Sequence, residues 1–134
     1  MTAHQNLSRK IEALLPRVSK PTRYLGNELN AIHDRNARIR VALWFPEVYE
    51  IGMSWPGQQI LYNVLNSLDG VAAERVYAFW PDMEKEMRAA EVPAFSLESW
   101  TPLHEFDILG FTLQYELVFT NILTILDLSG IPLR

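Results

Sequence analysis

Apolar residues in this chain fall into two patterns: short continuous runs, typical of buried strands, and longer runs with helical spacing. Residues 39–45 form a largely apolar run that predicts a central strand. Pro46 ends this strand because proline has no N–H to donate to a ladder. Residues 73–79 and 107–113 predict two further strands, and residues 94–97 are expected to form a short edge strand.

Four segments have the features of helices. Residues 6–17 are expected to form an amphipathic helix. Residues 81–91 are expected to form a short helix that begins at Pro81. The helix after the first strand is expected to begin at Ser54 as N-cap and to end at Gly70. Its apolar stripe consists of Ile60, Leu61, Val64, Leu65 and Leu68. Residues 117–128 are apolar on most sides, so this last helix is expected to be well buried.

Strands and helices therefore alternate along the chain, which predicts an α/β fold with a mostly parallel sheet and right-handed crossovers. The N-terminal helix and a polar connector occupy residues 1–36, and the α/β domain begins at residue 37. The pattern calls for another strand after residue 128. We therefore expect the domain to be incomplete at its C-terminal end.

The candidate site lies at the carboxyl ends of two predicted strands, residues 39–45 and 107–113. Parallel strands meet with their carboxyl ends at one edge of the sheet, where open α/β sheets hold ligands. The residues expected to bind a cofactor there are Glu50, Gly52, Met53, Ser54, Gly57, Thr112, Gln114 and Tyr115. Glycine allows close approach of a ligand, and a helix N-terminus can hold a phosphate or an amide. The alternative is that the same residues form a tight connection and cap helices.

The composition of the chain excludes several kinds of binding site and function. The chain has 12 basic and 16 acidic residues and a net charge of −4, which argues against a nucleic-acid surface. Without cysteine, it has no disulfide, thiolate metal site or cysteine-ligated iron–sulfur cluster. The three histidines, His4, His33 and His104, lack ligand spacing, so neither a catalytic residue nor a metal site is predicted. The absence of cysteine fits a cytoplasmic protein. The sequence predicts neither a signal peptide nor a membrane span.

Several segments, in order, resemble one family. These segments are residues 20–28, 45–54, 60–62, 74–77, 80–83, 95–99, 107–116 and 126–132. Together they are similar to the N-terminal region of uncharacterised radical S-adenosylmethionine (SAM) proteins that carry a cobalamin-binding-like domain before the radical domain. The resemblance implies a flavodoxin-like or Rossmann-like three-layer fold that lacks its final part here. It also implies a downstream partner domain with a three-cysteine motif, which would hold the iron–sulfur cluster and SAM.

The resemblance makes cobalamin (vitamin B12) the expected cofactor, although the loop at residues 46–57 has no histidine to serve as a lower cobalt ligand. The expected function is an accessory module that presents cobalamin or substrate to the radical domain. The chain by itself is not expected to be catalytic. One alternative is a degenerate Rossmann-like interaction module that binds no cofactor. Another is a small nucleotide or flavin binder.

Overall fold

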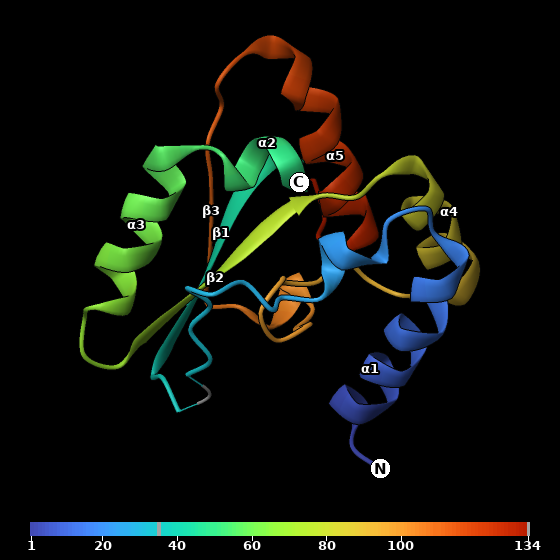
Figure 1. Ribbon diagram of the computed structural model, residues 1–134, viewed down its shortest axis with the longest axis horizontal. Coiled ribbons are helices and arrows are strands. Elements are labelled where there is room, and N and C mark those ends of the chain that lie inside the picture. Colours follow the sequence, from blue (N-terminus) through green and yellow to red (C-terminus); the bar gives the residue numbers. More distant parts are fainter. Residues whose placement is uncertain (35, 134) are drawn as a thin grey trace.

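The computed structural model describes residues 1–34 and 36–133 and shows an α/β fold around a parallel sheet. Strand β1 (Ile39–Val48) lies between β2 (Val71–Ala78) and β3 (Ile108–Phe111), so the order is β2-β1-β3 (Figure 1). The register places Leu43 of β1 opposite Arg75 of β2 and Gly110 of β3. The predicted parallel sheet is confirmed. Residue 35, inside the predicted connector, and residue 134 lie outside the described residues.

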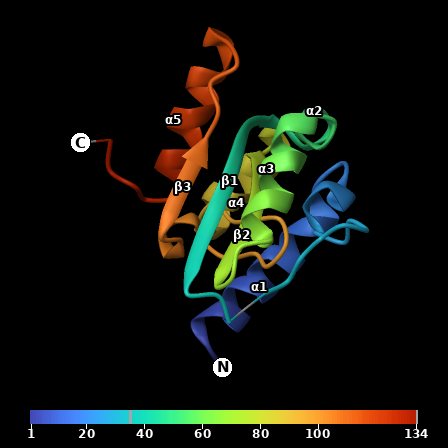
Figure 2. The same cartoon turned by 90° about the vertical axis from the view of Figure 1, so that its left-hand side faces the viewer.

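Helices cover both faces of the sheet because successive side chains of a strand point to opposite faces. On one face, Val41 and Leu43 pack against Tyr62 of α3 (Pro56–Asn66). On the other, Trp44 packs against Ile122 and Ile125 of α5 (Phe119–Leu128). Figure 2 shows α3 and α5 on opposite sides of the strands. The remaining helices are α1 (Ala3–Leu14), the short α2 (Tyr49–Met53) and α4 (Pro81–Ala90).

Helix α1 packs against α4 through a second apolar cluster away from the sheet. Ile11 and Leu14 meet Met83 and Met87 there, and all four are buried. The helix begins at residue 3, earlier than predicted, because the Thr2 hydroxyl accepts from the Gln5 N–H while the Gln5 side chain accepts from the Thr2 N–H. It ends at residue 14 and continues as a 3₁₀ turn (Leu15–Arg17).

The face of α3 that packs against the sheet is not the apolar stripe that the sequence predicts to be buried. Ile60 is 62% exposed and Val64 53%, whereas Gln58 and Tyr62 are buried. Polar contacts explain this orientation, since the Gln58 amide donates to the Leu43 carbonyl and the Tyr62 hydroxyl accepts from the Ile32 N–H. The start also differs, with Trp55 rather than Ser54 at the N-cap position.

Two further segments correct the predictions. Residues 94–97 form no strand; Phe95 makes a single antiparallel bridge with Pro102, and the intervening loop folds back through a Ser96 N–H to Thr101 carbonyl bond. The last helix begins at residue 119 after a 3₁₀ turn and is half-exposed instead of well buried. Leu123 is 51% exposed because only one side of α5 faces the sheet.

The outer edge of β2 is closed by side chains and by the backbone of Leu97 instead of a fourth strand. The Asn66 amide donates to the Ala73 carbonyl and accepts from the Ala73 N–H. The Glu98 carboxylate accepts from the Arg75 N–H, and the Leu97 N–H donates to the Arg75 carbonyl. An edge satisfied in this way is a poor template for pairing with another chain.

We expect Asn66→Ala to lower the free energy of unfolding by about 1–3 kcal/mol, because the buried Ala73 N–H and carbonyl lose their partner. Chemical denaturation followed by circular dichroism would measure this loss. Asn63→Ala is the matched control on the same helix, at an exposed position. Equal losses in the two variants would contradict the edge-closing role of Asn66.

Candidate functional site

A crevice opens between the carboxyl ends of β1 and β3. The chain leaves β1 through α3 to reach β2, and later returns to pair β3 with the opposite side of β1. Strand order reverses at β1, and such a switch point is where open α/β sheets bind ligands. The crevice has a volume of about 470 Å³, within the range of small-molecule sites.

The walls of the crevice are apolar, aromatic and uncharged. Leu43 and Phe45 of β1, Trp55 and Leu61 around α3, and Phe111 of β3 contribute to them. The rings of Phe45 and Trp55 contact each other with their centroids 5.6 Å apart, which fixes the tryptophan at the rim. None of the side chains that line the crevice carries a charge.

Gly110 keeps the β3 side of the crevice open. A Cβ atom at this position would lie 3.9 Å from Leu43 Cδ2, an ordinary van der Waals distance. A larger side chain here would therefore enter the crevice without striking the backbone. The absence of a side chain leaves a flat floor for a ligand.

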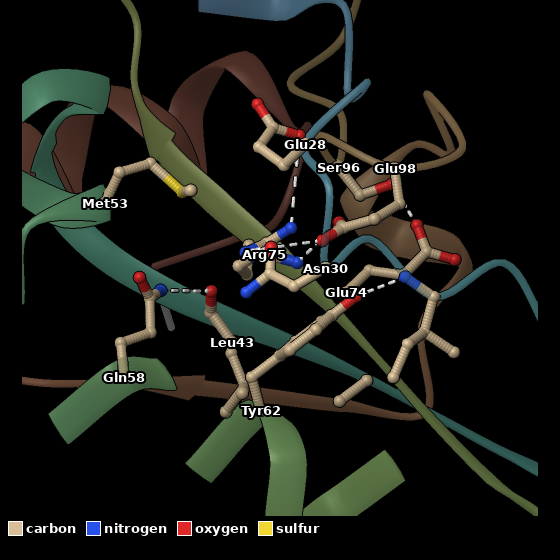
Figure 3. A network of polar contacts seen from close by, with 12 residues as sticks. Glu28, Asn30, Leu43, Met53, Gln58, Tyr62, Glu74, Arg75, Ser96 and Glu98 are labelled. Atoms are coloured by element: carbon tan, nitrogen blue, oxygen red, sulfur yellow. Dashed lines mark hydrogen bonds and ion pairs between the residues drawn. The ribbon is translucent and has the colours of Figure 1, made fainter. Parts of the chain in front are cut away.

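Two polar side chains at the crevice have unused hydrogen-bonding capacity. Gln58 is 5% exposed; its amide nitrogen donates to the Leu43 carbonyl over 3.0 Å (Figure 3), whereas its Oε1 is buried. Neither Gln58 Oε1 nor the buried Thr112 Oγ1 has a hydrogen-bond partner among the described residues. Buried polar atoms without partners are costly, and both belong to side chains that line the crevice.

Three of the predicted site residues meet in this crevice. Gly57 lies at the first turn of α3, and Thr112 and Gln114 follow β3; all three line the cavity. They come together because the ends of β1 and β3 are adjacent in the sheet. The other five predicted residues do not line it.

Glu50 instead anchors the connector. Its carboxylate accepts from Arg23 Nε over 2.7 Å, and the guanidinium of Arg23 lies 4.1 Å above the Trp80 ring. Desolvation works to raise the pKa of Glu50, but the hydrogen bond and charge of Arg23, together with hydrogen bonds from its own backbone and from Trp80, outweigh it, and the pKa is lowered overall. Glu50 is therefore an ionised partner of Arg23.

Gly52, Met53 and Ser54 have internal partners in and beside α2. A Cβ at Gly52 would lie 2.2 Å from the Tyr77 ring, so glycine is needed there for packing. The Tyr77 hydroxyl donates to Met53 Sδ, and the Ser54 hydroxyl donates to the Glu50 carbonyl.

Tyr115 lies outside the crevice, where its hydroxyl donates to the carboxylate of Glu47. This hydrogen bond raises the pKa of Tyr115 above its usual value. The contact ties the segment after β3 to the end of β1. Asn121 adds a second tie by donating to the Pro46 carbonyl.

Sequence reasoning missed the buried ionic network beside the crevice (Figure 3). Arg75 and Glu98 form an ion pair over 2.6 Å with both side chains fully buried. The guanidinium of Arg75 also lies 4.3 Å above the Tyr62 ring. Glu74, on the opposite face of β2, pairs with Arg40 over 2.5 Å. Two adjacent charged residues inside an apolar strand were the available signal, because buried charges need partners.

The described residues contain no group of three or more histidine, aspartate or glutamate side chains arranged to hold a metal ion. His104 lies in a 3₁₀ turn (Leu103–Glu105) just before β3, at the end of the sheet opposite the crevice. Among the helices of the described ranges, none combines the length and apolar character that crossing a membrane requires.

Comparison with known proteins identifies a family. The family model described as the N-terminal region of radical SAM proteins matches residues 57–134, more than half of the chain. The match begins at the first turn of α3 and includes the Gln58, Gly110 and Thr112 side of the crevice. No curated protein and no solved structure matches the chain.

Proposed function

The chain belongs to the family of N-terminal regions of radical SAM proteins, and we propose that it is an accessory module whose crevice holds cobalamin for a downstream radical domain. One observation carries the proposal. An uncharged crevice of about 470 Å³, with two unpaired buried polar atoms, lies at the switch point of the sheet. The SAM and iron–sulfur chemistry would belong to that downstream domain, since this chain has no cysteine.

The crevice fits an uncharged part of cobalamin. Its lining is uncharged and largely apolar, and Gly57 and Gly110 leave room for close approach. No histidine lines the crevice, so none of its lining residues would supply an imidazole to the cofactor. Bound cobalamin would supply methyl-group or electron transfer.

The chain's own residues would orient the cofactor and exclude water from it. Trp55, 43% exposed at the rim, offers an aromatic surface on the α3 side, and Phe111, 46% exposed, offers another on the β3 side. Ordering these half-exposed rings against a ligand would remove apolar surface from water, which favours binding.

Titration with hydroxocobalamin under anaerobic conditions, followed in the visible spectrum, tests the proposal. We expect saturable binding that Gly110→Phe weakens at least tenfold, because the new ring would occupy the crevice. Gly110→Ala is the matched control and should bind nearly as well as the parent, since one methyl group adds only ordinary contacts.

Circular dichroism of both variants separates lost binding from lost folding. A folded protein that gives no spectral change with hydroxocobalamin would overturn the cobalamin assignment. Equal binding by Gly110→Phe and the parent would place the cofactor elsewhere.

A second candidate function is supported by the unusual orientation of α3. Ile60 and Val64 of the helix and Leu68 just after it are more than half exposed, and residues 56–68 contain no charged side chain. An exposed apolar helix face of this kind is typical of a protein interface. A module that binds a partner and no cofactor would explain this face, and absence of cobalamin binding would favour it.

A further inference from the structure

The outer edge of β3 differs from the outer edge of β2, because nothing among the described residues closes it. In a strand, the N–H and the carbonyl of one residue point to the same side, and successive residues alternate. The Asp107 N–H donates to the Arg40 carbonyl, so the backbone of Asp107 points toward β1. The backbone groups of Ile108 and Gly110 therefore point outward, and no hydrogen bond among the described residues reaches them. Figure 2 shows β3 as the outermost strand on this side of the sheet.

The side chains at this edge are apolar, exposed and uncharged. Ile108 is 51% exposed, Phe111 46% and Leu113 54%, whereas the central strand β1 is buried over most of its length. Residues 108–115 contain no charged side chain and no proline. The charges and prolines that commonly protect an edge strand are therefore missing from this segment. Outward backbone groups need ladder partners, so the occupant that fits this edge is another strand.

Two copies of this edge are complementary to each other. A two-fold axis perpendicular to the sheet brings two β3 strands together in antiparallel order. If Ile108 of one copy lies opposite Gly110 of the other, every outward N–H of these residues finds an outward carbonyl. Leu109 then lies opposite Leu109 of the second copy, at a position where antiparallel strands approach closely. Because residues 108–115 are uncharged, the pairing opposes no like charges within this segment.

We propose that β3 pairs with β3 of a second copy of this chain, in the register that places Ile108 opposite Gly110. Residues directly opposite each other share one face of a sheet. Gly110 is in register with Leu43 on the α3 side of the sheet, and it lines the crevice there. Ile108 of the second copy therefore lies beside Gly110 and adds an apolar group to the β3 side of the crevice. The inference goes beyond the proposed function, because strand pairing needs no cofactor.

Leu109→Cys tests the register, since the chain has no cysteine of its own. Residue 109 faces its own copy in the proposed pair, where Cα atoms about 4.5 Å apart allow a disulfide. Leu113→Cys is the matched control, because residue 113 lies beyond the end of β3 and does not face itself in this register. Under mild oxidation we expect Leu109→Cys to form a covalent dimer at least tenfold faster than Leu113→Cys. Non-reducing gel electrophoresis would measure both rates.

Sedimentation velocity of the parent chain provides an independent test. We expect a dimer that forms as the concentration rises and that Ile108→Lys weakens at least tenfold, because lysine on an edge strand opposes pairing. Leu117→Lys is the matched control, since it adds the same charge at an exposed apolar residue outside β3. It should leave the dimer nearly unchanged. Circular dichroism of all variants separates lost pairing from lost folding.

Three results would overturn the proposal. A folded parent chain that stays monomeric at millimolar concentration would favour a strand from another segment or another protein at this edge. Equal cross-linking of the two cysteine variants would show that the copies meet without the proposed register. A dimer that Ile108→Lys leaves intact would place the interface elsewhere, for example on the exposed face of α3. None of these results depends on hydroxocobalamin, so the failure of this inference is distinct from the failure of the proposed function.

Discussion

Glu98→Ala is expected to lower the free energy of unfolding by about 3–5 kcal/mol, the usual cost of leaving one member of a buried ion pair alone. The Glu98 carboxylate accepts from Arg75 Nε over 2.6 Å and from the Arg75 N–H over 2.8 Å. Its loss leaves a fully buried guanidinium and a strand-edge N–H without this partner. Small domains have about 5–15 kcal/mol of stability in total, so much of it would be lost.

Arg75 stays protonated, so the variant would not avoid this loss of stability. Burial works to lower the pKa of Arg75, but the charge and hydrogen bond of Glu98, with smaller contributions from Tyr77 and Tyr62, together outweigh that effect, and the pKa is raised above its ordinary value. An arginine side chain stays charged in proteins in any case. The variant would therefore keep a buried charge with weaker partners: the Glu28 carboxylate at 3.9 Å and the side-chain oxygens of Asn30 and Gln59 at 3.2 Å.

Urea denaturation followed by tryptophan fluorescence would measure the effect. Glu84→Ala is the control, because it removes an exposed carboxylate from its bond with Arg88 and should cost at most about 1 kcal/mol. Similar losses for the two variants would show that the Arg75–Glu98 pair does not support the fold as the structure indicates.

Gly26→Ala is the second substitution with a large expected effect, about 2–5 kcal/mol of unfolding free energy. Gly26 has a φ of +66°, which costs other residues about 1–2 kcal/mol. In addition, a Cβ there would lie 2.1 Å from the Leu97 carbonyl oxygen, so backbone must move, at a cost of about 1–3 kcal/mol. The displaced segment carries Glu98, so the change would also disturb its pairing with Arg75.

Gly130→Ala distinguishes the cost of the positive φ from the cost of the close contact with Leu97. Gly130 has nearly the same φ, +65°, but a Cβ there would have nothing within 4 Å. It should therefore show only the conformational cost of about 1–2 kcal/mol. Thermal and urea unfolding of both variants would test this, and equal losses would mean that contact with Leu97 contributes nothing.

The connector illustrates a segment whose role the sequence left open. Residues 20–28 lie in the predicted polar connector, and their sequence alone indicates no partner in the fold. In the structure, Tyr24 is 5% exposed, its carbonyl accepts from Trp100 Nε1 and its hydroxyl accepts from the Trp80 N–H. These contacts join residues more than 50 positions apart, and local pattern contains no information about such partners.

By itself, the sequence determined the parallel α/β fold and the convergence of Gly57, Thr112 and Gln114 at one edge of the sheet. Strand and helix periodicity is local, and short alternating elements allow few topologies. Only the tertiary structure decided which face of α3 is buried, that Glu50 pairs with Arg23, and that Gln58 lines the crevice. Apolar pattern predicts burial, but the orientation of α3 depends on polar groups that find partners in distant segments, as Gln58 does at Leu43 and Asn66 at Ala73.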